Sequence, residues 1–476
     1  MSPAALRLFH RLPPFLRDAA ASVHGRRLRA WRTGPETERL IEEALERDAW
    51  GPDEWRAYRE ERLARLLHRA ATRVPFYRDQ WAERKRRGDR QSWESLENWP
   101  LLSKDDLRRN PSAFVADDCE TPLMYRERTS GTTGLPLEVW WSRETVRAWF
   151  AIYDARIRRW NGIAAGEPWA ILGGQPVVSA NARRPPFWVW NASMRQLYLS
   201  ANHVAPATAA SFFAAMEARR VTHLIGYPSS LAYLARQALA QRVRPPSRLR
   251  VVVTNAEPLL PWQRAAIADG MEADVRETYG MAEIAAAGSE CAEGFLHAWP
   301  EAGIVETCAD DGDRAAPTGA SGRFVATALL NADMPLIRYV LGDRGRIAPD
   351  SGAPCACGRR LPVFAAIEGR SNDLLVAPDG RRVFWLNPVF YGLAIREAQI
   401  VQEAIDRLRV LYVPAPGFDA RQKSAIGERL RERMGPVAVA FEECEAIPRG
   451  ANGKFRAIVS RVDPGDGRTE PRSARA

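Results

Sequence analysis

The chain has 476 residues, of which 46% are hydrophobic and 26% charged, a balance typical of a globular protein with two or three domains. Lysine and arginine number 68 against 58 acidic residues, a net charge of +10, and only four of the 68 cations are lysines. No apolar run is long enough to span a bilayer, the first residues lack a secretory signal, and six cysteines do not indicate a disulfide scaffold. Because charges of both signs interleave without a nucleic-acid-binding signature, we expect a cytoplasmic protein without a transmembrane segment or a nucleic-acid partner.

Helices are expected throughout the first 90 residues. Residues 1–33 hold seven arginines and a single acid, Asp18, and Pro13-Pro14 would interrupt a continuous helix there. Residues 36–90 keep a helical spacing of apolar residues until Val74-Pro75 breaks it. Two interpretations of the basic N-terminal segment stay open: a helical extension packed on its own domain, or a surface for a membrane or a partner helix.

Short apolar runs alternate with helical patterns from about residue 120 onward, which predicts an α/β fold with mainly parallel sheets. A small C-terminal α/β domain is expected after Gly369-Arg370, and residues 463–476 have the composition of a disordered tail. The expected strands are 169–172, 250–254, 407–413 and 437–446, and the expected helices are 211–219, 230–241 and 420–434.

Three segments combine residue types suited to a nucleotide. The loop Thr129-Ser-Gly-Thr-Thr-Gly-Leu-Pro136 offers hydroxyls and backbone N–H groups to an anion. Asn255-Ala-Glu-Pro258 follows a buried strand, where α/β folds place ligands. In Glu277-Thr-Tyr-Gly-Met-Ala-Glu283 the tyrosine can stack on a purine and a carboxylate can hold Mg²⁺. Each segment taken alone also fits an ordinary loop.

Two further segments carry charge in turns. Leu336-Ile-Arg-Tyr-Val-Leu-Gly-Asp343 ends in an aspartate that could accept bonds from ribose hydroxyls, and Arg370 could pair with a phosphate. Pro448-Arg-Gly-Ala-Asn-Gly-Lys454 presents one of the four lysines in a glycine-rich loop. So rare a residue in such a loop indicates a functional role.

The cysteines and a histidine form a separate pattern. Cys291 and His297 lie close in sequence, as do Cys355 and Cys357 much further along the chain. Three thiolates and an imidazole are a suitable tetrahedral zinc set, although the C-x-C spacing is tighter than usual. The residues alone leave open a structural zinc site or unpaired buried thiols with a satisfied histidine.

Taken in order, these segments resemble the adenylate-forming (acyl-CoA synthetase) superfamily, and most closely its phenylacetate–CoA ligase-like branch, which includes capsule-locus and natural-product ligases. The resemblance runs from residue 129 to residue 454, and the Val74-Pro-Phe-Tyr-Arg78 element is similar as well. It implies a large N-terminal multi-sheet α/β adenylation domain with a small mobile C-terminal lid. The expected boundaries are 1–90 for the helical extension, 91–371 for the adenylation domain, 372–462 for the lid and 463–476 for the tail.

The resemblance also implies roles for individual residues. Lys454 would bridge the carboxylate and the α-phosphate, Glu283 would hold Mg²⁺, and Tyr227 with Gly280 would contact the acid. Cys291, His297, Cys355 and Cys357 would hold a structural zinc ion, as similar pairs do in this branch. The ATP-binding residues would be Ser130, Gly131, Thr132, Thr133, Gly134, Ala256, Glu257, Pro258, Tyr279, Asp343 and Arg370.

The implied reaction converts a carboxylic acid and ATP to acyl-AMP and pyrophosphate, followed by transfer to coenzyme A. The many rings of residues 140–190 would suit an aromatic or planar acid, although core packing is the simpler explanation for most of them. An amine or other nucleophile as acceptor, a non-catalytic nucleotide-binding relative, and a homodimer stay open. Three positions depart from the superfamily pattern: Leu137, Ala282 and Asn372, the last at the expected hinge.

Overall fold

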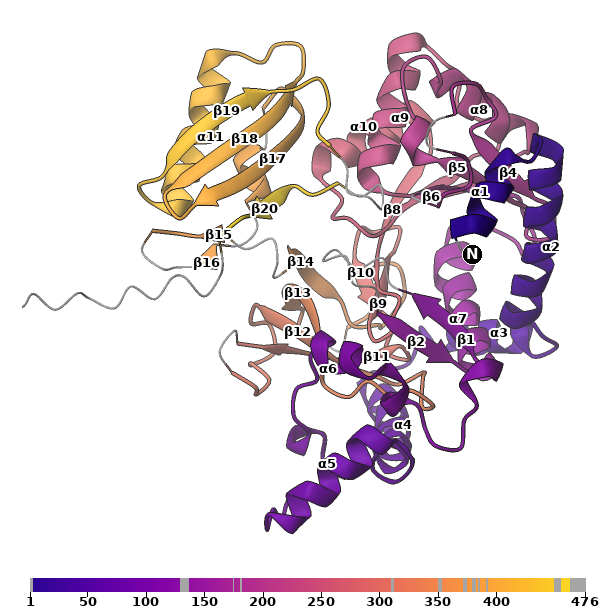
Figure 1. Cartoon of the computed structure of the whole chain (residues 1–476), viewed down its shortest axis with the longest axis vertical. Helices are drawn as coiled ribbons and strands as arrows, with labels where there is room; N and C mark the ends of the chain where they lie inside the picture. Colours follow the sequence, from indigo (N-terminus) through magenta and orange to yellow (C-terminus); the bar gives the residue numbers. More distant parts are fainter. Residues whose placement is uncertain are drawn as a thin grey trace, which may run out of the picture. The chain divides into compact units, whose positions relative to one another are not determined.

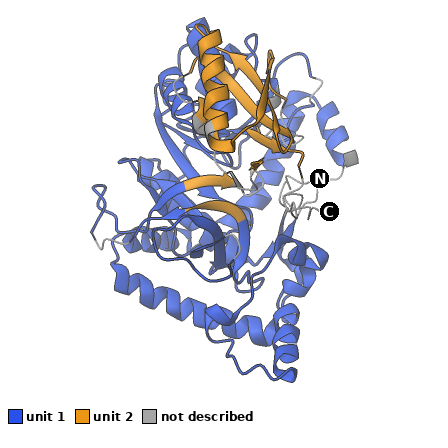
Figure 2. Cartoon of the chain, turned by 90° about the vertical axis from the view of Figure 1, so that its left-hand side faces the viewer, with its two compact units in different colours: residues 1–341, 346–366 blue, residues 342–345, 367–476 orange. Residues whose placement is uncertain are grey.

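The computed structural model describes residues 3–128, 137–173, 175–179, 182–309, 312–349, 353–370, 375–378, 382–383, 386–390, 393–448 and 455–462. These residues belong to two compact units (Figure 2), one of residues 1–341 with 346–366 and one of residues 342–345 with 367–476. In the described part of the chain, no helix has the length and apolarity needed to cross a membrane.

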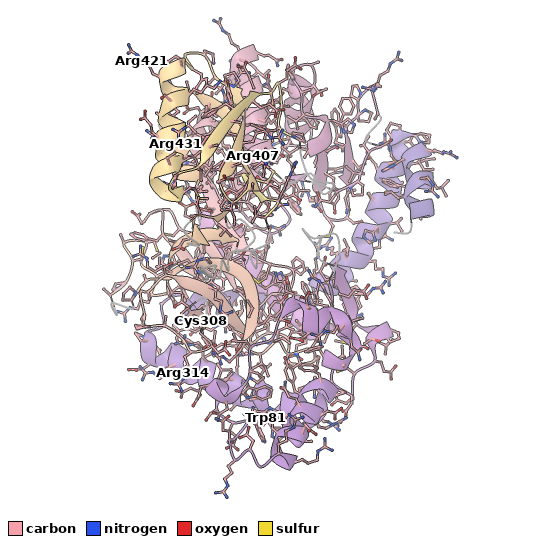
Figure 3. The ribbon with its side chains drawn as sticks, turned by 60° about the vertical axis from the view of Figure 1, so that its left-hand side comes forward. Trp81, Cys308, Arg314, Arg407, Arg421 and Arg431 are labelled. Carbon is pink, nitrogen blue, oxygen red and sulfur yellow. The ribbon has the colours of Figure 1, made fainter. Side chains whose placement is uncertain are left out.

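The first unit begins with five helices, as expected: α1 (Pro3–Arg11), α2 (Pro14–Arg32), α3 (Thr37–Arg47), α4 (Pro52–Arg73) and α5 (Pro75–Arg86). The breaks at Pro13-Pro14 and Val74-Pro75 are confirmed, because a proline opens each following helix at its first position. On α5, Trp81 (Figure 3) is buried and packs edge-on against Trp99 with the ring centroids 5.3 Å apart. A short helix α6 (Lys104–Arg109) follows, with Ser103 as its cap.

An eight-stranded sheet forms the centre of this unit, in the order β10-β9-β8-β7-β6-β3-β5-β4 (Figure 1). The inner strands β8, β7, β6, β3 and β5 are parallel, whereas β4, β9 and β10 pair antiparallel at the two sides. The strands are β3 (Trp169–Gly173), β4 (Trp188–Asn191), β5 (Gln196–Ser200), β6 (His223–Gly226), β7 (Val251–Thr254), β8 (Asp274–Gly280), β9 (Ala287–Glu290) and β10 (Leu296–Ala298).

Both faces of the sheet are buried, which explains the continuous apolar runs of its strands. Along β7, Val252 packs on the face covered by α8 (Ala209–Ala218), α9 (Pro228–Gln241) and α10 (Pro261–Met271). Val251 and Val253 point to the other face, toward α3 and α7 (Arg143–Tyr153). The expected strands at 169–172 and 250–254 and the expected helices at 211–219 and 230–241 are confirmed within two residues.

The remaining strands of this unit show that the architecture is less uniformly parallel than expected. A two-stranded antiparallel ribbon joins β1 (Tyr125–Arg128) to β2 (Glu138–Trp141). A four-stranded sheet in the order β11-β12-β13-β14 begins with an antiparallel pair, β11 with β12. Its strands are β11 (Gly303–Cys308), β12 (Gly322–Ala328), β13 (Tyr339–Ile347) and β14 (Phe364–Arg370).

The second unit holds a four-stranded sheet in the order β19-β18-β17-β20, a small ribbon of β15 and β16, and the helix α11. Ile426, Leu430 and Met434 recur at helical spacing on α11 (Ala420–Met434) and are fully buried. The expected helix is confirmed, and the expected last strand is shorter than predicted. The strands are β15 (Leu375–Val376), β16 (Arg382–Val383), β17 (Ile395–Ala404), β18 (Arg407–Pro414), β19 (Ala438–Glu443) and β20 (Ile458–Ser460).

Candidate functional site

Three neighbouring parallel strands bring predicted site residues to one edge of the central sheet. Tyr227 follows β6, residues 256–258 follow β7, and β8 ends at Tyr279 and Gly280. The hydroxyl of Thr278 donates to the carbonyl of Thr254 at 2.7 Å and ties the ends of β8 and β7 together. Tyr227, residues 256–258 and Tyr279 therefore share the edge at which folds of this class bind ligands.

The loop after β7 is bonded to the segment that joins β6 to α9, and its backbone is strained. The backbone N–H of Asn255 donates to Gly226 at 3.0 Å, and that of Ser229 donates to the Glu257 carboxylate at 3.1 Å. Ala256 has a φ of +64°, a left-handed conformation that costs a residue with a β-carbon roughly 1 kcal/mol or more. Strain of this kind persists where the surrounding bonds impose it, as these two bonds do.

Asn255 lies at the start of the same loop, and the sequence alone does not indicate a role for its side chain. Its side-chain oxygen is buried and has no hydrogen-bond partner among the described residues. A buried acceptor left unpaired costs about 1–3 kcal/mol unless a ligand or a water satisfies it. The atom lies beside the strained loop, and only the fold reveals that it is buried.

Tyr279 and Glu283 occupy different surroundings. The ring of Tyr279 is half-buried and meets Phe364 edge-on at 5.2 Å between centroids. Glu283 is 7% exposed, and the hydroxyl of Tyr339 donates to one of its carboxylate oxygens at 2.9 Å. Tyr339 therefore orients the carboxylate, a positioning partner that the sequence argument did not identify.

Glu277 lies at the base of the same edge and has a perturbed acidity. Burial raises its pKa to about 7, and the nearby carboxylate of Glu290 acts in the same direction. The backbone N–H of Leu259 donates to Glu277 at 3.3 Å and opposes the shift, while Arg264 pairs with Glu290 at 2.9 Å. The segment containing Glu277 was singled out from the sequence, but its burial could not be.

Several predicted site residues have no described position. Residues 130–134 and Lys454 lie outside the described residues, as does the expected hinge at Asn372, and the side chain of Arg370 is not described. The ribbon strands β1 and β2 flank the first of these segments, with Arg128 opposite Glu138. Asp343 lies on β13, in the stretch grouped with the second unit.

The four predicted metal ligands, by contrast, converge. The ligand atoms of Cys291, His297, Cys355 and Cys357 all lie within 4.8 Å of one another. Cys291 follows β9 and His297 lies on β10, while the two other thiols sit in a turn closed by a 2.8 Å bond from the N–H of Gly358 to the carbonyl of Cys355. Two sequence-distant pairs thus form one compact cluster inside the first unit.

The surroundings of the cluster orient its donors. The imidazole of His297 is fully buried, and its Nδ1 lies 3.1 Å from the carbonyl of Leu361, which leaves Nε2 directed toward Cys357 at 3.5 Å. Burial also lowers the pKa of His297, so the ring is neutral, as a metal ligand must be. Burial raises the pKa of Cys355 to about 11, and the neighbouring thiols Cys291 and Cys357 add to this. In the absence of a cation, this thiol stays protonated.

Aromatic rings expected near an acid pocket make packing contacts in the structure. Trp169 stacks on His223 at 5.8 Å, Phe187 stacks on His203 at 4.7 Å, and Trp160 meets His297 edge-on at 6.0 Å. These contacts follow the core-packing alternative. The remaining rings of the expected set are Trp140, Trp141, Trp149, Phe150, Tyr153, Trp188 and Trp190.

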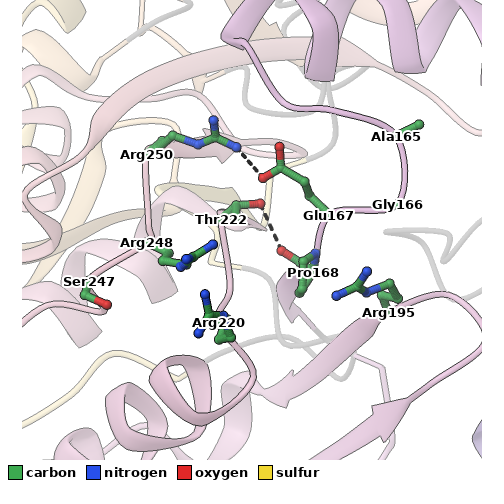
Figure 4. A pocket seen from close by; sticks show the side chains of 10 residues that line it. All are labelled: Ala165, Gly166, Glu167, Pro168, Arg195, Arg220, Thr222, Ser247, Arg248 and Arg250. Atoms are coloured by element: carbon green, nitrogen blue, oxygen red, sulfur yellow. Dashed lines mark hydrogen bonds and ion pairs between the residues drawn. The ribbon is translucent and has the colours of Figure 1, made fainter.

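A pocket of about 520 Å³ lies at the opposite edge of the central sheet (Figure 4). Its wall comes from segments just before β3, β6 and β7, and it carries four arginines and the Glu167 carboxylate, which pairs with Arg250. Because it faces the amino ends of the strands, it is separate from the edge that carries Tyr227, residues 256–258 and Tyr279. None of the predicted site residues lines it.

Comparisons with known proteins agree with the observed fold. Residues 56–331 match the family model described as AMP-binding enzyme, and residues 375–461 match the CapK C-terminal domain. Protein CapK of Staphylococcus aureus is 24% identical over 379 residues, 77% of this chain and 81% of that protein. Phenylacetate-coenzyme A ligase of Thermus thermophilus is 29% identical over 364 residues, 72% of this chain and 74% of that protein.

The fold itself has solved counterparts. A crystal structure of 2-hydroxyisobutyryl-CoA ligase in the postadenylation state shares it with a TM-score of 0.66 at 22% identity, covering 87% of this chain and 91% of that chain. The AMP-binding enzyme model covers more than half of the present chain. The chain therefore belongs to the AMP-binding enzyme family, in the phenylacetate–CoA ligase-like branch of the adenylate-forming superfamily, and is an ATP-dependent, AMP-forming ligase.

Proposed function

We propose that the protein activates a carboxylic acid as an acyl-AMP and then transfers the acyl group to coenzyme A. In the first step a carboxylate oxygen attacks the α-phosphorus of ATP and the bond to pyrophosphate breaks. In the second, a thiolate attacks the acyl carbon and AMP leaves with the bonding electrons. Family membership supports the first step, and the printed names of several relatives, phenylacetate-coenzyme A ligase among them, support the choice of acceptor.

The observation that carries the proposal is that Tyr227, residues 256–258 and Tyr279 follow or end adjacent parallel strands at the same edge as Asn255, whose side-chain oxygen is buried and unpaired among the described residues. Adenine carries an exocyclic amine, a donor that this buried acceptor lacks in the protein alone. We assign adenine to this edge, with Tyr279 against the base and the carbonyls of the strained loop beside it. A ligand that satisfies Asn255 would also offset the cost of keeping the oxygen buried.

For the phosphates we propose residues 130–134 and, for Mg²⁺, the carboxylate of Glu283. When bound, the cation neutralises charge on the phosphates and on the departing pyrophosphate. Glu283 fits that role because Tyr339 engages one of its oxygens, which fixes the orientation of the carboxylate. Asp343 and Arg370 would contact the ribose and the nucleotide, Gly280 would line the acid site, and Lys454 would stabilise negative charge on the reacting groups.

For the acid we propose an aromatic or planar carboxylic acid. Two points support this class: Tyr227 follows β6 beside the proposed adenine loop, and relatives include phenylacetate-coenzyme A ligases. Since most of the neighbouring rings serve packing, the pocket is proposed from few side chains, and the class of acid is the first quantity to measure.

For the cysteine–histidine cluster we propose a structural zinc ion. Three thiols and a neutral imidazole within 4.8 Å supply four protein ligands and leave no position for a reacting water. The bond between His297 and Leu361 fixes the tautomer that presents Nε2. Binding would hold Cys355, whose pKa is raised, as a thiolate and would join the turn at Cys355 to β9 and β10.

The function is tested by pyrophosphate release over a panel of aryl, branched and linear carboxylic acids, each with and without coenzyme A. We expect release that depends on the acid and accelerates with coenzyme A, together with formation of the thioester. Acid-dependent release whose rate does not change with coenzyme A would indicate that the acceptor is an amine or another nucleophile. If no acid in the panel causes release, the activity is not acid adenylation and the nucleotide-binding scaffold gains support.

A further inference from the structure

The helix α2 covers the open edge of the central sheet, and it does so with its polar side. The edge strand β4 turns the N–H of Trp190 outward, where it donates to the Asp18 carboxylate at 2.9 Å. Just beyond the strand, the N–H of Ala192 donates to the hydroxyl of Ser22 at 2.9 Å. The four-residue spacing of Asp18 and Ser22 on the helix matches the two-residue spacing on the strand. These bonds protect an edge that could otherwise pair with another chain.

This arrangement reverses the usual orientation of a surface helix. With its polar residues turned inward, α2 leaves Phe15 69%, Leu16 41% and Val23 74% exposed, and on α1 Leu8 is 65% exposed. These are four of the seven large hydrophobic residues that are exposed in the described part of the chain. Surface helices normally bury such residues, so four of them left exposed on two consecutive helices indicate that something else covers this part of the surface.

The charge of α1 and α2 indicates what kind of partner would cover the exposed apolar residues. Residues 1–33 contain seven arginines, and their single acid, Asp18, is turned toward Trp190. The exposed arginines beside the apolar residues are Arg7, Arg11, Arg26, Arg27 and Arg29. A second copy would bring like charges together across a symmetric interface, which opposes self-association through this face. An anionic lipid surface offers both negative charge and an apolar layer.

We propose that the outer face of α1 and α2, called here the N-terminal face and defined by Leu8, Phe15, Leu16 and Val23 with the five exposed arginines, binds the surface of an anionic lipid bilayer. The helices would lie in the plane of the interface, with the apolar side chains among the acyl chains and the arginines at the head groups. No helix needs to cross the membrane. Binding would hold the ligase at the membrane surface without involving its nucleotide edge.

The test is co-sedimentation of the full chain with vesicles of phosphatidylcholine alone or mixed with phosphatidylglycerol, at low and high salt. We expect binding to the mixed vesicles only, and weaker binding as salt rises. Phe15→Ser should reduce that binding at least about tenfold, from the apolar area it withdraws. The double variant Arg26→Gln, Arg27→Gln should reduce it more than tenfold, at about fivefold for each charge near the anionic surface.

Matched variants elsewhere on the chain distinguish binding through the N-terminal face from nonspecific binding to vesicles. Leu123→Ser removes a leucine that is 71% exposed, and Arg421→Gln with Arg431→Gln removes two exposed arginines of α11 (Figure 3). Both should leave vesicle binding unchanged, and circular dichroism should show that every variant is folded. Absence of binding to the mixed vesicles overturns the proposal. Equal loss in the control variants also overturns it, as does a dimer in sedimentation equilibrium that Phe15→Ser dissociates.

Discussion

The edge of the central sheet that we propose for the nucleotide and the cysteine–histidine cluster both draw residues from the segment β8–β10, but their polar groups are satisfied in different ways. At the edge, the side-chain oxygen of Asn255 is buried and unpaired, the backbone of Ala256 is strained, and the pKa of Glu277 is raised to about 7. In the cluster, four donors face one another and a backbone carbonyl orients the imidazole. A site that binds a ligand in each cycle is expected to leave polar groups unpaired until the ligand arrives. A structural site is expected to pair its polar groups within the protein.

This contrast predicts that damage to the cluster lowers stability and damage to the edge lowers binding or catalysis. The largest effect is expected for Cys355→Ser, because three ligands hold zinc less tightly and the turn is released from β9 and β10. We expect a loss of at least about 3 kcal/mol in unfolding free energy, together with the metal. Elemental analysis and thermal unfolding of protein purified without chelating resin measure both.

The matched control for that variant is Cys119→Ser, a half-buried thiol outside the cluster. It should keep both the metal and the melting temperature. A native protein that contains no zinc and is as stable as Cys355→Ser would remove the structural half of the contrast.

Lys454→Ala tests the catalytic part of the contrast. Loss of one electrostatic stabiliser of the reacting groups should slow adenylation by at least about a hundredfold. ATP binding should change little, since the adenine contacts proposed here come from the first unit. Steady-state pyrophosphate release gives the rate, and near-normal release by the variant would refute the role of Lys454.

Glu277→Gln uses the raised pKa directly. The unfolded chain ionises this carboxyl above pH 4.5, whereas the folded chain ionises it only above about pH 7, so the native protein loses stability as pH rises between these values. Glutamine mimics the neutral acid at every pH. The unfolding free energy of the variant should therefore match that of the native protein at pH 4 and exceed it by about 3 kcal/mol at pH 8.

Denaturant unfolding across that pH range measures the difference between the two proteins. Glu293→Gln, at an exposed position, is the control and should show no such pH-dependent gain. A gain of the same size at both ends of the range would mean that burial of a charge is not the cause.

The smallest expected effect is that of Asn255→Ala. Removing the unpaired oxygen should weaken ATP binding about fivefold, the equivalent of one hydrogen bond, and should leave stability unchanged or slightly higher. The control is Asn161→Ala, where the amide donates to the carbonyl of Ile157 at 2.9 Å. For Asn161→Ala we expect the opposite result, a loss of stability with no change in ATP binding.

The sequence predicted much of this arrangement because local signals suffice for it. Proline positions ended α1 and α4, apolar runs located β3 and β7, and the order of the loops identified the family. The convergence of Cys291, His297, Cys355 and Cys357 was also predicted, from residue types and spacing together with the resemblance. The antiparallel pair of β11 and β12 was missed because apolar runs do not reveal the direction of pairing.

What the sequence could not provide depends on burial and on distant contacts. The acidity of Glu277 arises from its surroundings, and the pairing of Tyr339 with Glu283 joins residues 56 positions apart. The orientation of α2 could not be read from its composition either. It follows from the bonds that Asp18 and Ser22 make to a strand more than 160 residues away.

The most direct test of the contrast is isothermal titration of ATP with Mg²⁺ into the native protein, Asn255→Ala and Cys355→Ser at a temperature where all three are folded. We predict one ATP per chain, about fivefold weaker binding in Asn255→Ala, and unchanged binding in the metal-site variant. Equal weakening in both variants, or no binding of ATP to the native protein, would contradict the account.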